Sequence, residues 1–156
     1  RVLRALMESP HDVSVVVDRQ WRNYWEHRFD EPLSDAESMR ISENGQILEL
    51  GQEVTDIEKI QAQYIGLTRF RHGGLESLRA ARHALGEIPR DWMQVRLVRQ
   101  AYMTDLLMEL ILRDCEVYAV FIDGGWLEID TENDLSGAAA MWADGSIKIF
   151  FDPSAT

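Results

Sequence analysis

The chain has a single cysteine, Cys115, and only two lysines, Lys59 and Lys148, among its 156 residues. One cysteine forms no disulfide within the chain, which favours a reducing compartment, so we expect a cytoplasmic protein. No apolar run reaches the roughly 18 residues that a membrane span requires, and no signal-peptide pattern opens the chain. We therefore expect no membrane insertion.

Several catalytic motifs are absent as well. The sequence contains no GxSxG, HExxH, CxxC or GxxxxGK(S/T) pattern, and its four histidines lack the spacing of metal ligands. These absences argue against most hydrolases, zinc enzymes and P-loop proteins.

Acidic residues, in contrast, are abundant. The 27 Asp and Glu residues exceed the 16 Lys and Arg residues, which gives a formal net charge of −11. Nucleic acids and anionic membranes are bound by concentrated basic patches, and the sequence has none, so neither is an expected partner. With 46% hydrophobic residues, the composition is typical of one soluble globular domain over residues 1–156.

Apolar periodicity predicts alternating strands and helices. Val13–Val17 is short and β-branched, as in a strand buried on both faces, and it ends at Asp18. The apolar segment Val117–Ile122 predicts a central strand, and residues 62–70 a further strand. Asn44-Gly45 favours a two-residue hairpin turn, because both positions tolerate positive φ. Helices are expected over residues 1–7, 21–28, 75–85 and 95–113. The predicted fold class is mixed α/β.

The segment Gly124–Thr131 carries the most informative carboxylates. In an extended chain Trp126, Glu128 and Asp130 share one face. Two carboxylates about 6.6 Å apart along a strand can serve a divalent cation, one directly and one through water. Asp130 also follows a strand, where ligands of α/β sheets gather. The same spacing equally fits solvated residues at a strand terminus.

Other acidic positions leave two interpretations open. Asp18 either faces a ligand at a strand end or caps the following helix. Asp105 interrupts the apolar stripe of its helix, so it is a structural cap or a site residue. Asp35-Ala36-Glu37 directs two carboxylates the same way if extended, or forms a solvated loop. Asp134 follows Thr131 as in a capping box, which favours capping over ligand contact.

Aromatic residues also allow two interpretations. They could form a cage around a quaternary ammonium group, or, more often at such spacings, belong to the hydrophobic core. An acidic pocket with aromatic walls would favour a cationic ligand. The residues concerned are Trp21, Tyr24, Trp25, Tyr64 and Trp126.

Taken in order, these segments resemble the C-terminal portion of the nucleotidyltransferase superfamily, which has a glycosyltransferase-A-like, mixed-sheet, three-layer α/β fold. The similarity is greatest to cytidylyltransferases for choline phosphate and related phospho- or phosphono-amino alcohols, and it extends to sugar-phosphate nucleotidyltransferases. The matching segments are Val15-Val16-Val17-Asp18, Asp35-Ala36-Glu37, Gln63-Tyr64-Ile65-Gly66-Leu67, Met103-Thr104-Asp105-Leu106-Leu107, and Gly125-Trp126-Leu127-Glu128-Ile129-Asp130-Thr131 with Asp134-Leu135.

The resemblance implies transfer of a nucleoside monophosphate from a nucleoside triphosphate, with CTP favoured, and release of pyrophosphate. The acceptor would be phosphocholine, aminoethylphosphonate or a sugar phosphate. Because such an acceptor is already an anion, positioning and charge neutralisation by Mg²⁺ would dominate catalysis. The resemblance implies Asp130 as the catalytic and metal-binding aspartate, with Glu128 beside it. The acceptor pocket would be lined by Asp18, Glu37, Tyr64, Asp105 and Trp126.

One departure from the family is large: no strand leading into a glycine-rich, basic triphosphate loop precedes the matching segments. We therefore expect residues 1–156 to be the C-terminal portion of a nucleotidyltransferase domain, lacking its N-terminal nucleotide-binding part and inactive alone. The alternative is a non-catalytic ligand-binding or assembly module derived from the same fold. The apolar surface of a truncated sheet would favour self-association into a homo-oligomer.

Overall fold

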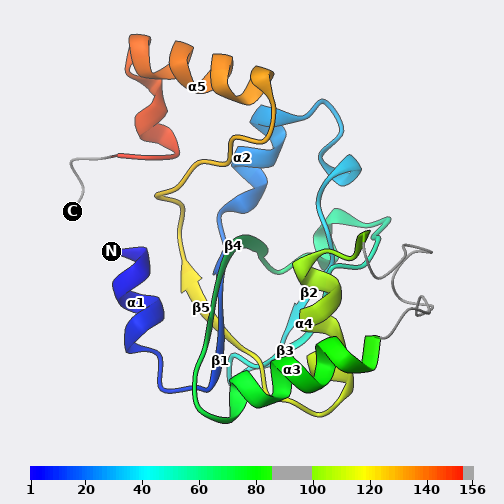
Figure 1. The fold of residues 1–156 in the computed structure, drawn as a ribbon. Coiled ribbons are helices and arrows are strands. Elements are labelled where there is room, and N and C mark those ends of the chain that lie inside the picture. Colours follow the sequence, from blue (N-terminus) through cyan, green and yellow to red (C-terminus); the bar gives the residue numbers. More distant parts are fainter. Residues whose placement is uncertain (86–99, 153–156) are drawn as a thin grey trace.

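The computed structural model describes residues 1–85 and 100–152, which form a mixed α/β structure (Figure 1). Three strands build the main sheet, β1 (Val13–Asp18), β4 (Gln63–Phe70) and β5 (Tyr118–Ile122), in the order β4-β1-β5. β1 runs antiparallel to β4 and parallel to β5. The mixed sheet agrees with the predicted fold class.

β1 is the central strand, and all six of its residues are buried. The prediction of a central strand at residues 117–122 is wrong for the described part of the chain, because β5 lies at the sheet edge and Phe121 is exposed. Among residues 1–85 and 100–152, only the start of β5 is paired on its outer side, through a bridge between Gln46 and Tyr118. An apolar segment indicates that both faces of a strand are buried, but it does not indicate whether the strand is central or at the edge of the sheet.

The predicted hairpin is present as β2 (Met39–Ile41) and β3 (Ile47–Leu50), but its turn differs from the prediction. The amide of Ser42 donates to Gln46 O at 2.9 Å, and the amide of Gly45 donates to Ser42 O at 2.9 Å. The loop therefore has three residues, and Gly45 alone in it adopts a positive φ, of 85°. A turn followed by a left-handed glycine bulge suits this hairpin, so Asn44 does not need positive φ.

Five helices surround the sheet in the described residues: α1 (Val2–Glu8), α2 (Trp21–Arg28), α3 (Gly73–Leu85), α4 (Met103–Leu112) and α5 (Glu132–Asp144). Single turns of 3-10 helix occupy Pro32–Ser34, Ile57–Lys59 and Ser146–Ile149. α1 contacts all three strands, while α4 packs against α3 and β3. Figure 1 shows α1 to one side of the sheet, α3 and α4 to the other, and α2 and α5 beyond the ends of β1 and β5. No helix of the described residues combines the length and apolarity needed to cross a membrane.

The helix predicted over residues 95–113 begins later than expected. Residues 95–99 lie outside the described residues, and α4 starts at Met103. Tyr102 is extended, with φ −84° and ψ 168°, and its amide donates to the Asp105 carboxylate at 2.7 Å. Tyrosine is not among the preferred N-cap residues, so the sequence pattern gave no sign of this helix start.

The hydrophobic core joins the sheet, α2, the hairpin and α4. Trp21, Tyr24 and Trp25 are buried in it, and Tyr64 and Trp126 pack against it. The rings of Trp21 and Trp25 meet edge-on at 5.8 Å, and those of Tyr24 and Trp126 at 5.9 Å. The core interpretation is therefore confirmed for Trp21, Tyr24 and Trp25, whereas Tyr64 and Trp126 are only partly buried. Trp25 and Tyr64 also line the pocket described next.

Candidate functional site

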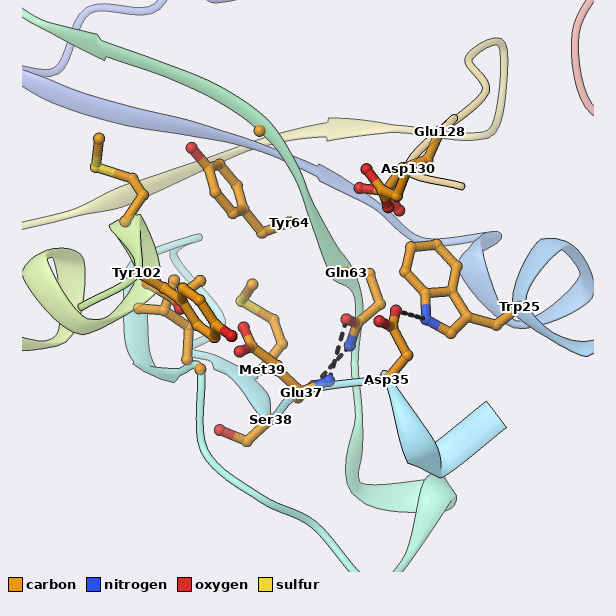
Figure 2. Close-up of a pocket in the computed structure, with 15 residues that line it drawn as sticks. Trp25, Asp35, Glu37, Ser38, Met39, Gln63, Tyr64, Tyr102, Glu128 and Asp130 are labelled. Atoms are coloured by element: carbon orange, nitrogen blue, oxygen red, sulfur yellow. Dashed lines mark hydrogen bonds between the residues drawn. The ribbon is translucent and has the colours of Figure 1, made fainter. Parts of the chain in front are cut away.

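An open pocket of about 260 Å³ lies between α2, the hairpin, β4, the start of α4 and the chain segment before α5 (Figure 2). Four carboxylates line it: Asp35, Glu37, Glu128 and Asp130. Three aromatic side chains line it as well: Trp25, Tyr64 and Tyr102. No basic residue is among the described residues of its lining. The described lining is therefore acidic and offers carboxylates to cationic groups.

Glu128 and Asp130 belong to the irregular segment 125–130 between β5 and α5, which forms no ladder with another strand. The side chain of Tyr24 hydrogen-bonds the backbone of this segment, as a neighbouring strand would do in a sheet. The amide of Glu128 donates to the Tyr24 hydroxyl oxygen at 3.0 Å, and that hydroxyl donates to Glu128 O at 2.9 Å. The two carboxylates, predicted to share one face, do reach the same partner, Arg28.

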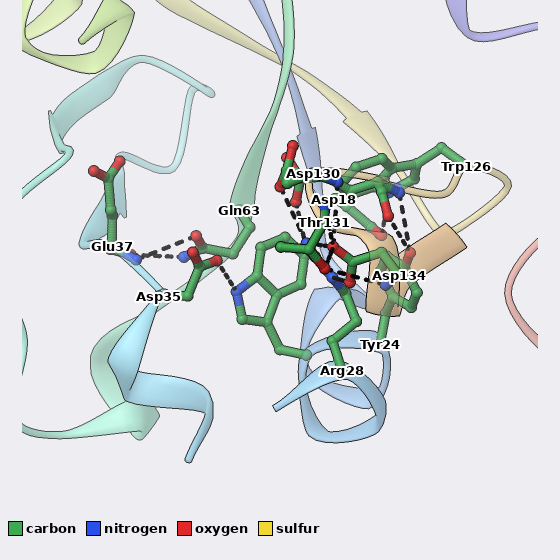
Figure 3. Close-up of polar contacts among 12 residues, drawn as sticks. Asp18, Tyr24, Arg28, Asp35, Glu37, Gln63, Trp126, Asp130, Thr131 and Asp134 are labelled. Carbon is green, nitrogen blue, oxygen red and sulfur yellow. Dashed lines mark hydrogen bonds and ion pairs between the residues drawn. The ribbon is translucent and has the colours of Figure 1, made fainter. Parts of the chain in front are cut away.

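Arg28, the last residue of α2, binds three carboxylates (Figure 3). Its Nη1 lies 2.6 Å from Glu128 Oε2, its Nη2 3.1 Å from Asp130 Oδ2, and its Nε 3.0 Å from Asp134 Oδ1. The Arg28 side chain is only 5% exposed. Its guanidinium also lies 4.9 to 5.6 Å from the ring centres of Tyr24, Trp25 and Phe29.

The cluster shifts the pKa of each of its members in a different way. Burial opposes the charge of Arg28, but hydrogen bonds from the three carboxylates outweigh it and raise the pKa of Arg28 above its ordinary value. The Arg28 guanidinium holds the pKa of Asp134 well below its usual range. Burial raises the pKa of Glu128, the neighbouring charge of Asp130 adds to the rise, and Arg28 offsets part of it.

Asp134 also caps α5, as the sequence predicts. Its amide donates to Thr131 Oγ1 at 3.1 Å, and the amide of Thr131 donates to Asp134 Oδ2 at 2.9 Å. Sequence analysis missed Arg28 as the partner of this carboxylate. A signal was present, because Arg28 is four residues after Tyr24 and three after Trp25 and therefore continues the buried aromatic face of α2.

Asp18 and Trp126 lie outside the lining of the main pocket. Asp18 is 2% exposed and accepts from the amides of Gln20 at 2.8 Å and Gly124 at 2.9 Å, and from Trp126 Nε1 at 2.8 Å. Both Asp18 and Trp126 face a smaller hollow of about 30 Å³ beside Phe150. The interpretation of Asp18 as a turn residue fits this geometry, but Asp18 does not cap α2, because the N-cap of that helix is Gln20 and Asp18 accepts from the Gln20 amide.

Glu37 and Tyr64 do line the pocket, where the resemblance placed them. The backbone of Glu37 is held by Gln63: the Glu37 amide donates to Gln63 Oε1 at 3.3 Å, and Gln63 Nε2 donates to Glu37 O at 2.6 Å. The Tyr64 hydroxyl pairs with Thr68 Oγ1 at 2.9 Å, and burial raises the pKa of Tyr64. Gln63 is a further residue that sequence reasoning missed, and its place just before Tyr64 gave no distinguishing signal.

Asp105 lies behind the pocket wall. It is fully buried at the third position of α4 and caps that helix through the amide of Tyr102. Its three preceding neighbours, Tyr102, Met103 and Thr104, line the pocket, whereas Asp105 is absent from the described lining. The structural-cap interpretation fits Asp105, which thereby orients the start of α4 toward the pocket.

The chemistry of Glu128 and Asp130 suits Mg²⁺, which prefers carboxylate oxygens. The side chain of Asp130 is 62% exposed and that of Glu128 30%, and both face the pocket. Within residues 1–85 and 100–152, no group of three or more His, Cys, Asp or Glu is placed to hold a metal. Mg²⁺ is commonly held by one or two carboxylates, with substrate phosphates and water completing its shell. The pair therefore fits a cation that arrives on a phosphorylated substrate.

Comparison with known proteins gives one informative match. No protein-family model matches the chain. The chain is 37% identical, over 134 residues, to the CTP:phosphoglutamine cytidylyltransferase of Campylobacter jejuni. The alignment covers 85% of this chain and 51% of that protein, so the chain spans about half the length of the curated relative it matches. The chain is therefore related to the cytidylyltransferases, which are nucleotidyltransferases, as the order of its sequence motifs predicts.

Proposed function

We propose that the protein containing this chain transfers a cytidylyl group from CTP to a phosphorylated or phosphonate acceptor. An acceptor oxygen attacks the α-phosphorus of CTP, the bond between the α-phosphorus and its bridging oxygen breaks, and pyrophosphate leaves. The observation that carries the proposal is the acidic pocket in which Glu37, Tyr64, Glu128 and Asp130 meet, within a chain 37% identical to a cytidylyltransferase. The mixed sheet is compatible with the three-layer nucleotidyltransferase fold, which we propose for the whole domain.

Positioning and charge neutralisation account for the catalysis in this proposal, because the acceptor oxygen is already anionic and needs no strong general base. A bound Mg²⁺ supplies the charge that stabilises the phosphates during transfer. Asp130 would hold the ion directly, and Glu128 would do so through water. Arg28 keeps both carboxylates at the same edge of the pocket.

We further propose that the acceptor carries a cationic amino group. Carboxylates and aromatic rings together stabilise an ammonium group, by charge attraction and by cation–π contact. The pocket offers both: Asp35, which accepts from the indole of Trp25 at 3.0 Å, and Glu37 supply carboxylates, and the ring of Tyr64 is also part of the lining (Figure 2). Phosphocholine carries a quaternary ammonium group, and aminoethylphosphonate and phosphoglutamine, the substrate named for the relative, carry an amino group that is cationic at neutral pH. The phosphate of a simple sugar has no cationic group.

The test measures pyrophosphate release by the full-length protein with CTP, Mg²⁺ and a panel of acceptors. We expect turnover with amino-bearing acceptors, and we expect Asp130→Ala to lower kcat at least about a hundredfold. Asp123→Ala is the matched control, because Asp123 is an exposed aspartate paired with Arg19, outside the described lining of the pocket. Activity retained by Asp130→Ala would remove Asp130 from the catalytic site.

A non-catalytic ligand-binding module is the second candidate function. One observation favours it: Arg28 already binds both carboxylates that a metal would need. Such a module would be stabilised by the phosphorylated amine alone, because a ligand that binds only the native state raises its apparent melting temperature. A rise in Tm with the acceptor, without CTP and without pyrophosphate release, would favour the module over the enzyme.

A further inference from the structure

We propose that Arg28 is a positioning residue that holds Asp130 in place until a divalent cation takes over that carboxylate, while Glu128 and Asp134 stay bound to Arg28. The carrier of the cation, a nucleoside triphosphate, rests on the proposed function. The exchange itself concerns only residues of this chain, so it is measurable without turnover.

The three carboxylates are held unequally. Asp134 is 9% exposed and receives two contacts from Arg28, at 3.0 Å from Nε and 3.3 Å from Nη2, and it also caps α5 through Thr131. Glu128 lies 2.6 Å from Nη1. Asp130 has one contact, at 3.1 Å, and its side chain is 62% exposed. Among these three, Asp130 is the carboxylate that can leave Arg28 with the smallest loss.

Movement of Arg28 away from its carboxylate partners is energetically unfavourable. Its side chain is 5% exposed, and an almost covered charge without a partner is strongly unfavourable. After Asp130 leaves, Nε and Nη1 keep their carboxylate partners on Asp134 and Glu128. The planar guanidinium, with five donors, can bridge several carboxylates at once, which the single ammonium of lysine cannot do with the same geometry.

The consequence is a carboxylate pair that is shaped before the cation arrives. Without Arg28, the like charges of Glu128 and Asp130, two residues apart, would repel each other and spread. With Arg28 bound, the two carboxylates stay at the same edge of the acidic pocket, which the substrate would enter (Figures 2 and 3). A cation with two charges can then replace the one arginine contact of Asp130.

The first test uses the wild-type, full-length protein labelled with ¹⁵N. The side-chain NMR signals of Arg28 are followed during titration with Mg²⁺ alone and with Mg²⁺ and CTP. We expect the Nη2 signal to shift as Asp130 exchanges, while the Nε signal, which reports the contact to Asp134, stays in place. An Nη2 signal that does not respond, or an Nε signal that moves equally, would overturn the proposal.

The second test measures Mn²⁺ affinity by electron paramagnetic resonance. Arg28→Gln removes the positive charge that competes with the cation for Asp130, and this gain outweighs the spreading of the two carboxylates. We therefore expect the Mn²⁺ dissociation constant to fall by about fivefold or more. Arg28→Lys, which keeps the charge but cannot bridge three carboxylates, should give an intermediate value. The matched control is Arg22→Gln on the same helix, whose side chain is 45% exposed and pairs with Glu26 and Glu58. Its Mn²⁺ affinity should equal that of the wild type.

Equal Mn²⁺ affinities for the wild type and both Arg28 variants, or weaker Mn²⁺ binding by Arg28→Gln, would overturn the proposal. If Arg28→Gln fails to fold, Arg28→Lys and the wild-type NMR titration still decide. The outcome is also separate from that of the proposed function. An Arg28 exchange without pyrophosphate release keeps this inference and removes the enzyme, whereas turnover with unresponsive Arg28 signals removes this inference alone.

Discussion

Asp18 is the last residue of β1 and Asp130 lies in the irregular segment before α5, and the two acidic residues have opposite environments. Asp18 is 2% exposed, and three uncharged N–H donors, two from the backbone and one from Trp126, satisfy its oxygens. Asp130 is 62% exposed and has one side-chain ion pair, to Arg28. A carboxylate whose oxygens all accept hydrogen bonds from protein donors stabilises the fold, whereas a carboxylate with a single exchangeable partner is available to a ligand.

The largest effect is expected from Asp18→Ala. The substitution leaves the amides of Gln20 and Gly124 and the indole of Trp126 without their acceptor in a buried place, so the free energy of unfolding should fall by about 3 kcal/mol. Urea unfolding measures the loss. The exposed Asp123→Ala control should lose no more than about 0.5 kcal/mol. A loss no larger than that control would make Asp18 available for a ligand and would break the comparison.

A smaller and pH-dependent effect is expected from Asp134→Asn. Because Arg28 lowers the pKa of Asp134 in the folded state, this carboxylate stabilises the fold above its unfolded pKa of about 3.9, and the stabilisation disappears as pH falls through the lower folded value. At pH 7 the variant should lose about 1–2 kcal/mol. Its stability should also fall less steeply below about pH 4 than that of the wild type.

For Glu128 we expect a pH dependence of the free energy of unfolding that is opposite in sign to that of Asp134. Burial raises its pKa in the folded state, so ionisation of Glu128 costs stability as pH rises through that value. Glu128→Gln should therefore remove the fall of stability that occurs as pH rises from the unfolded pKa of about 4.3 to the higher folded value, and thermal unfolding from pH 3 to 7 would show it. Identical pH profiles for the Asp134 and Glu128 variants would contradict the division of roles within the Arg28 cluster.

The smallest effect on stability is expected from Asp130→Asn. Its own side chain is 62% exposed and has a single contact to Arg28, so the free energy of unfolding should change by no more than about 0.5 kcal/mol. The same urea experiment as for Asp18 makes the two values directly comparable. A loss as large as that of Asp18→Ala would show that Asp130 is a structural residue and would remove it from the cation site.

Local elements were predictable because their signals are local. The β-branched run at Val13–Val17 and the aromatic spacing of Trp21–Arg28 gave β1 and α2 nearly to the residue. Elements that depend on distant partners were not predictable in the same way. The place of β5 in the sheet depends on its pairing with β1, which lies far away in the sequence. The start of α4 was missed for another reason: its cap between Tyr102 and Asp105 is local, but tyrosine is not a preferred N-cap residue.

The site residues were likewise predictable only in part. Glu37, Tyr64, Glu128 and Asp130 meet in one pocket, as the resemblance implies, although their roles there stay predictions. Asp18, Trp126 and Asp105 do not line that pocket in the described residues. Sequence position placed all of them near strand or helix ends, but it did not show which carboxylates the protein's own donors already satisfy.

The sequence by itself determined most of the strands and helices, the acidic character of the chain and the order of motifs that relates it to cytidylyltransferases. Periodicity, charge and motif order depend on neighbouring residues, so they are readable along the chain. The tertiary structure alone decided that Arg28 joins Glu128, Asp130 and Asp134, residues 100 to 106 positions away. Charge attraction and hydrogen bonding depend on distance in space, and only the folded chain sets that distance.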